Sequence, residues 1–130
     1  MSAQADAGQT VLIVEDDELI RRAMQMVLEW EGYRVDCANN GLEALDYLRA
    51  GARPSVILLD VMMPVLDGEQ FRRQQLSDPA LASIPVIVVS AASFASAVDG
   101  AYHVRKPFEI QELLGALREH GHQPTTRPAG

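Results

Sequence analysis

The chain has 130 residues, 48% hydrophobic and 22% charged, a composition typical of one globular domain and not of a disordered chain. Eleven basic and eighteen acidic residues give a formal net charge of −7, which disfavours direct binding to nucleic acid or to an anionic membrane surface. One cysteine excludes an internal disulfide, and no signal peptide or bilayer-spanning apolar stretch is present, so we expect a cytoplasmic protein.

Five short segments have the patterns of β-strands. Three continuous apolar runs are rich in β-branched residues and too short for helices, which indicates central strands buried on both faces. These runs are residues 11–14, 56–59 and 86–89. Alternating apolar and polar residues over 33–37 and, more weakly, over 102–104 predict two edge strands, with Cys37 expected to be a small buried side chain.

Helical patterns lie between these strands. Apolar residues recur at helical spacing over 20–28 and over 110–117, which predicts two amphipathic helices. A third helix is expected over 40–51, with a capping residue at its start and a glycine at its end. Residues 67–76 are a weaker candidate for a fourth helix, and 91–98 have room for one or two helical turns.

Alternating strands and helices with short links predict right-handed βαβ crossovers. The expected fold is therefore of the α/β class, a doubly wound parallel sheet covered by helices on both faces. We expect one domain over 9–119, with loose tails over 1–8 and 120–130, because the ends lack any hydrophobic period.

Polar side chains follow the predicted strands where each strand ends. They are Glu15 and Asp16, Asp60, Ser90 and Lys106. The carboxyl ends of parallel strands meet in one crevice, so a binding site is expected there. Three close carboxylates repel one another, and hard oxygen ligands suit Mg²⁺. A carboxylate whose charge is masked by a metal and an ammonium group can attack a phosphoryl group, which favours an aspartyl phosphate.

Lys106 and Ser90 have the chemistry to complete such a site. Lys106 is the only lysine beside ten arginines, which indicates a need for a compact ammonium that neutralises phosphoryl oxygens. The Ser90 hydroxyl would donate a hydrogen bond to one of those oxygens, although a simple helix cap is a serious alternative for this serine.

At these residues the chain resembles receiver domains of the two-component response-regulator family, over roughly residues 9–119. The segments that carry the resemblance are 11–17 (VLIVEDD), 60–68 (DVMMPVLDG), 86–91 (VIVVSA) and 106–108 (KPF). Separations of 44 residues from Asp16 to Asp60 and of 30 from Asp60 to Ser90 also fit. The resemblance implies a flavodoxin-like, five-stranded sheet of order 2-1-3-4-5.

The resemblance also implies a chemistry for the acidic residues. Asp60 would be the phosphoacceptor, and Mg²⁺ would be held by Glu15, Asp16, Asp60 and the backbone carbonyl of Met62. The phosphoryl group would come from a phosphohistidine on a sensor histidine kinase or a histidine phosphotransfer protein, and the domain would hydrolyse it itself. Beyond that self-chemistry no enzyme activity is expected, and the signal would pass through altered binding to a downstream protein.

The remaining family positions lie near the predicted fourth and fifth strands. Ser90 matches the switch hydroxyl, Lys106 matches the family lysine, and Pro107 matches a position that usually follows a cis peptide bond aiming that lysine. Two departures are visible. His103, with Tyr102 before it, stands where an aromatic switch residue is usual, and only 16 residues separate Ser90 from Lys106, so the fourth helix is expected to be short or remodelled.

We expect a stand-alone receiver, monomeric or weakly dimeric, because only 13 residues follow Leu117, too few for a DNA-binding unit. If the chain is a piece of a longer protein, 120–130 would be a linker. Three alternatives stay open. One is a receiver-like module that works without phosphorylation, and the second is a metal-dependent phosphatase using Asp60, which would lack a general acid at Met62. Flavin binding is disfavoured because carboxylates follow the first strand.

Overall fold

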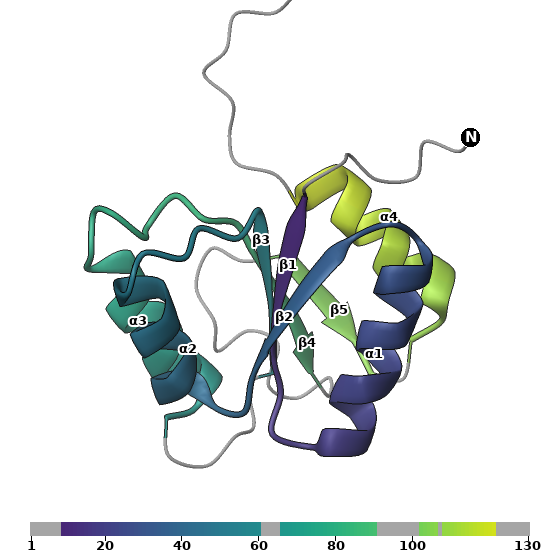
Figure 1. Cartoon of the computed structure of the whole chain (residues 1–130), viewed down its shortest axis with the longest axis horizontal. Helices are drawn as coiled ribbons and strands as arrows, with labels where there is room; N and C mark the ends of the chain where they lie inside the picture. Colours follow the sequence, from purple (N-terminus) through teal and green to yellow (C-terminus); the bar gives the residue numbers. More distant parts are fainter. Residues whose placement is uncertain (1–8, 61–65, 91–101, 107, 122–130) are drawn as a thin grey trace, which may run out of the picture.

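The computed structural model describes residues 9–60, 66–90, 102–106 and 108–121. Within these ranges the structure has five strands and four helices (Figure 1). The elements are β1 (Thr10–Val14), α1 (Glu18–Trp30), β2 (Arg34–Ala38), α2 (Gly41–Arg49), β3 (Val56–Asp60), α3 (Gly68–Leu76), β4 (Val86–Ser90), β5 (Tyr102–Arg105) and α4 (Ile110–His120). None of the helices in the described part of the chain has the length and apolarity needed to cross a bilayer.

The five strands form one parallel sheet of order β2-β1-β3-β4-β5, which confirms the expected fold and strand order. The order reverses between β1 and β3, where the chain leaves β1 toward β2 on one side and returns to β3 on the other. In open α/β sheets the binding crevice lies beyond the carboxyl ends of the strands at this reversal. The fold therefore brings the ends of β1 and β3 together.

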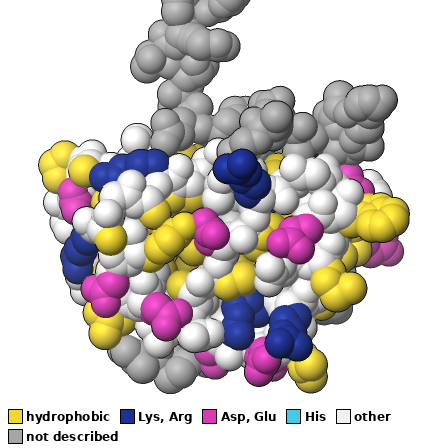
Figure 2. All heavy atoms as spheres, in the orientation of Figure 1, with side chains coloured by type: hydrophobic (Ala, Val, Ile, Leu, Met, Phe, Trp, Pro, Cys, Tyr) yellow, Lys and Arg dark blue, Asp and Glu magenta, His cyan; other side chains and the backbone are white. Residues whose placement is uncertain are grey.

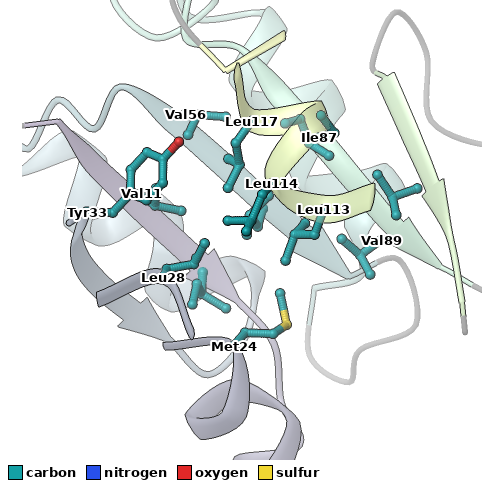
Figure 3. Close-up of a cluster of buried hydrophobic side chains, with 14 residues drawn as sticks. Val11, Met24, Leu28, Tyr33, Val56, Ile87, Val89, Leu113, Leu114 and Leu117 are labelled. Atoms are coloured by element: carbon teal, nitrogen blue, oxygen red, sulfur yellow. The ribbon is translucent and has the colours of Figure 1, made fainter. Parts of the chain in front are cut away.

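Helices cover both faces of the sheet, α2 and α3 on one side and α1 and α4 on the other (Figure 1). Alternate residues of β1 supply the two layers. Leu12 and Val14 pack on the α2–α3 side, whereas Val11 and Ile13 pack on the α1–α4 side, and all four are fully buried. Figure 3 shows the second layer, where α1 and α4 meet over the sheet. The central strands are thus buried on both faces, as expected from their continuous apolar sequences.

Local signals set the helix boundaries. The Asn40 side chain accepts a hydrogen bond from the backbone N–H of Glu43 at 2.8 Å, and Glu43 reaches back to the backbone N–H of Asn39. The end of α2 is followed by Gly51, whose φ of 116° lies in the left-handed region that glycine tolerates best. Asp67 and Gln70 form a reciprocal capping box at the start of α3, which explains why this weaker candidate is a full helix.

The helical periods over 20–28 and 110–117 place Ile20, Ala23 and Ile110 on inward faces, and Cys37 was expected to be buried, but all four side chains are exposed. Ile20 is 37% exposed and Ile110 is 41% exposed, because each lies in the first turn of its helix; for α1 this turn extends past the ends of the strands (Figure 1). Cys37 is exposed, since β2 is an edge strand. Its Sγ donates a long hydrogen bond to Oε1 of Gln25 at 3.5 Å instead of packing in the core.

A buried glutamine on α3 forms hydrogen bonds with the segment that leads into β4. The Nε2 group of Gln75 donates to the carbonyl oxygens of Leu81 and Ile84, both at 2.9 Å. Its Oε1 accepts a hydrogen bond from Nη1 of Arg72 at 2.8 Å. Because Gln75 is fully buried, water cannot replace these partners if the amide is removed.

We expect Gln75→Ala to lower the free energy of unfolding by about 2 kcal/mol or more, since it leaves buried carbonyl groups without a donor. Urea unfolding measures this change. The neighbouring variant Gln74→Ala removes the same amide from an exposed position and should change stability by less than about 0.5 kcal/mol. Equal small effects of the two substitutions would contradict a stabilising role for the buried amide.

Candidate functional site

The carboxyl edge of the sheet brings together two acids and the only lysine. Glu15 follows β1, Asp60 ends β3, and Lys106 follows β5. The Lys106 Nζ atom lies 3.6 Å from Oε1 of Glu15 and 3.8 Å from Oδ1 of Asp60. The structure thus places one ammonium group against two carboxylates that are 45 residues apart in sequence.

Asp16 completes an acidic cluster with these two residues. One carboxylate oxygen from each of Glu15, Asp16 and Asp60 lies within 4.8 Å of the others. Glu15 and Asp60 are buried, at 3% and 6% exposure, whereas Asp16 is exposed. The cluster therefore has a buried floor and a side open to solvent, through which a ligand could enter.

The loop that carries the acidic pair is held at several points. The backbone N–H of Glu15 donates to the Ala38 carbonyl at 3.1 Å, and its Oε2 accepts from the backbone N–H of Asp17 at 3.2 Å. Nη1 of Arg21, one turn into α1, donates to the Glu15 carbonyl at 3.0 Å. Asp17 in turn caps α1 by accepting from two backbone N–H groups of the first turn. The carboxylates are therefore preorganised by the β1–α1 connection.

The pKa of Glu15 is raised from its ordinary value of 4.5 to about 7, and burial is the largest cause. Repulsion from Asp60 contributes to this rise, and the positive charge of Lys106 opposes it. A divalent cation would relieve both the repulsion and the loss of solvation. The donor set, three carboxylates without sulfur or nitrogen, fits a hard cation such as Mg²⁺.

Other predicted site residues lie at the same edge or outside the described ranges. Ser90 is the last residue of β4, and because Asp60 pairs with Val89, the Ser90 backbone lies one residue further along the neighbouring strand. Met62, Pro107 and the segment 91–101, including the expected remodelled helix, lie outside the described residues.

Tyr102 and His103 occupy the edge strand β5. The Tyr102 ring stacks on His120, with ring centroids 3.8 Å apart and an interplanar angle of 17°. His120 is the last residue of α4, although the sequence analysis placed it in the C-terminal tail. His103 is half-buried, and its Nδ1 atom has no hydrogen-bond partner among the described residues. The switch roles of Tyr102 and His103 stay predictions.

Sequence reasoning missed Arg21 as a neighbour of the site. Its contact with the Glu15 carbonyl depends on how α1 is rotated against β1, which the local sequence does not specify. A basic residue four positions after a helix-capping aspartate was the only available signal, and it is shared by many surface helices.

Comparisons with known proteins agree with this geometry. The family model described as "Response regulator receiver domain" matches residues 11–118. A putative response regulator from Chloroflexus aurantiacus is 31% identical, with a TM-score of 0.80 over 85% of this chain and 95% of that structure. The receiver domain of the sensor histidine kinase PA1611 from Pseudomonas aeruginosa, solved with magnesium in its active-site cleft, is 28% identical, with a TM-score of 0.76 over 88% of this chain and 98% of that structure.

Curated relatives are longer than this chain. The transcriptional regulatory protein YkoG of Bacillus subtilis, itself uncharacterised, is 44% identical over 85% of this chain and 52% of its own length. The transcriptional regulatory protein CseB of Streptomyces avermitilis is 40% identical over 95% of this chain and 56% of its own length. The chain thus spans about half the length of the curated relatives that it matches.

The fold, the acidic edge and these matches define a signal-transduction receiver domain of the α/β class. The chain belongs to the response-regulator receiver family. Receiver domains bind Mg²⁺ in an acidic pocket, and the cluster of Glu15, Asp16 and Asp60 is such a group of acids in this chain.

Proposed function

We propose that this protein accepts a phosphoryl group on Asp60 from a phosphohistidine partner in a Mg²⁺-dependent step and signals through altered binding to another protein. The observation that supports this most is the position of Lys106, whose Nζ lies 3.8 Å from the buried carboxylate of Asp60. An ammonium at that distance is placed to neutralise phosphoryl oxygens added to Asp60.

Glu15, Asp16 and Asp60 would hold the metal, together with the Met62 carbonyl that the family resemblance implies. When bound, Mg²⁺ supplies positive charge that offsets the negative charges of the carboxylates and of the incoming phosphoryl group. Glu15 and Asp60 lose much of their solvation on burial, so they gain most from such a cation.

In the transfer step an Oδ atom of Asp60 forms a bond to phosphorus while the bond from phosphorus to the donor imidazole nitrogen breaks. The imidazole nitrogen keeps that electron pair, and the product is an acyl phosphate. Lys106 keeps its proton and balances the phosphoryl charge, and the Ser90 hydroxyl would donate to a phosphoryl oxygen. Hydrolysis later joins a water oxygen to phosphorus, breaks the bond to Asp60 and restores its carboxylate.

The partner and output follow from the same proposal. The phosphodonor would be a sensor histidine kinase or a histidine phosphotransfer protein, and the setting would be cytoplasmic. A net charge of −7 disfavours nucleic-acid contact by these 130 residues themselves. Because the curated relatives are named transcriptional regulators and are about twice as long, DNA binding would be the task of a separate domain where one is joined to the chain.

Mass measurement tests the phosphoacceptor directly. The intact protein is treated with a small acyl-phosphate donor and Mg²⁺, and we expect one phosphoryl adduct, which disappears with a chelator or in Asp60→Asn. The control Asp46→Asn changes an exposed aspartate on α2 and should keep the adduct. An adduct in Asp60→Asn, or none in the folded parent, would reject the proposal and favour the phosphorylation-independent module.

A further inference from the structure

Helix α1 carries the most exposed large hydrophobic side chains of the described residues. Trp30, Leu19 and Met26 are 88%, 81% and 71% exposed. With the exposed Ala23 they recur at intervals of four, three and four residues, which places them on one stripe of the helix. We call Leu19, Ala23, Met26 and Trp30 the α1 seam. In Figure 2 hydrophobic side chains protrude at intervals along the lower right of the molecule, where Figure 1 places α1.

The α1 seam is separate from the face that holds α1 on the domain. Met24 and Leu28 are the buried residues of α1, and they point toward the leucines of α4 (Figure 3). The helix therefore has two apolar faces, one packed in the core and one without a cover among the described residues. Exposed apolar clusters of this kind mark interaction surfaces more often than isolated surface hydrophobes do.

The spacing of the α1 seam is that of a coiled-coil stripe over two heptads, with Leu19 and Met26 at d positions and Ala23 and Trp30 at a positions. Arg22 and Glu29 then occupy the g positions on one flank. Ile20 and the half-buried Val27 occupy the e positions on the other flank. The flank formed by the g positions thus carries one positive and one negative charge seven residues apart. The flank formed by the e positions is apolar.

We propose that the α1 seam binds the α1 seam of a second copy of this chain, with the two helices antiparallel. Antiparallel pairing sets g positions against g positions, so Arg22 of each copy lies opposite Glu29 of the other. The twofold symmetry of the dimer makes this ion pair occur twice. Parallel pairing would set g against e and leave both charges opposite apolar side chains. The charge pattern is therefore self-complementary in the antiparallel arrangement only.

The apolar residues of the α1 seam also match under this symmetry. A positions meet d positions, so Trp30 of one copy packs against Leu19 of the other, and the small Ala23 faces the longer Met26. Arg22 already pairs with Glu18 at 3.4 Å on the surface, but both side chains are well exposed, so exchanging that partner costs little. The helix is also folded before contact, so no ordering of backbone opposes association.

One helix from each copy is a small interface, below the roughly 1,200 Å² of typical stable complexes. The dimer is therefore weak and forms at high protein concentration. Sedimentation measures its mass, and Trp30, the only tryptophan, reports on its formation because burial shifts indole emission toward the blue. We expect a concentration-dependent rise toward dimer mass with a parallel emission shift in the parent.

Substitutions decide whether the α1 seam is responsible. Met26→Lys should abolish both signals, whereas Leu42→Lys, at an exposed hydrophobe on α2, should leave them unchanged. Arg22→Glu and Glu29→Arg should each weaken association by about tenfold, since each creates two like-charged contacts. The double variant should restore the homodimer, and a mixture of the two single variants should associate better than either alone.

Four results would overturn this inference. The first is a monomer at every concentration with unchanged Trp30 emission, and the second is a dimer that survives Met26→Lys. The third is loss of association in the double charge variant, which would reject the antiparallel register. If a helix of another protein occupied the α1 seam of a monomeric chain, the second copy would likewise be excluded as its occupant.

Discussion

Lys106→Met will slow phosphorylation of Asp60 by about 10²- to 10³-fold, the loss typical of removing one preorganised group that stabilises developing charge. The Lys106 ammonium is the cation that the structure places against both buried carboxylates, at 3.6 Å from Glu15 and 3.8 Å from Asp60. Without it the phosphoryl oxygens face carboxylate charge with less compensation. The rate of adduct formation by intact mass, at saturating Mg²⁺, measures the effect.

The adjacent residue provides a matched control for this prediction. Arg105→Met removes one positive charge from an exposed side chain on β5 and should leave the phosphorylation rate within about threefold of the parent. Lys106→Arg keeps the charge but not the compact ammonium, so we expect partial activity. A parent-like rate in Lys106→Met would show that the lysine does not act on the phosphoryl group.

Glu15→Gln will raise the free energy of unfolding of the metal-free protein at pH 8 by about 3 kcal/mol. This is the free energy that corresponds to the raised pKa of Glu15 in the parent. The pKa of Glu15 is about 7 in the folded protein and 4.5 ordinarily. Between pH 4.5 and pH 7 the Glu15 carboxyl is therefore mostly protonated in the folded state and mostly ionised in the unfolded chain. The stability of the parent therefore falls as pH rises from 4.5 to 7 and stays reduced above 7. The variant lacks this loss because its amide does not ionise.

Urea unfolding at several pH values, with a chelator present, measures the stability difference. We expect it to be largest above pH 7 and to vanish near pH 4.5. Glu109→Gln makes the same change at an exposed position before α4 and should show no such gain. Adding Mg²⁺ should stabilise the parent more than Glu15→Gln, because the variant loses a carboxylate ligand. A stability difference that does not depend on pH would contradict the raised pKa.

The strands and their chemistry were readable from local patterns. The continuous apolar runs of β1, β3 and β4 predicted burial on both faces, and the polar residues after them marked one edge of the sheet. Such patterns are informative because the period of side chains in a strand and the capping chemistry of a helix act over a few neighbouring residues.

Contacts between distant segments were not readable in this way. The edge position of β2 was predicted, but the exposure of Cys37 depended on how α1 lies over that strand, and the Tyr102–His120 stack depended on where α4 ends against β5. The exposed apolar face of α1 could not be predicted from the sequence, because Ala23 fits the same helical period as the buried residues of that helix. Only packing shows which part of a wide apolar face is covered.

By itself the sequence determined the α/β class, the run of strands and helices, and the residue types available for chemistry, since these follow from hydrophobic period and local capping. The family resemblance implied the strand order and one shared site, whereas the tertiary structure decided how close Lys106 comes to Glu15 and Asp60. It also decided which face of α1 is left for a partner. The physical reason is that burial and charge contacts arise between segments far apart in the chain, whose free energies no local pattern contains.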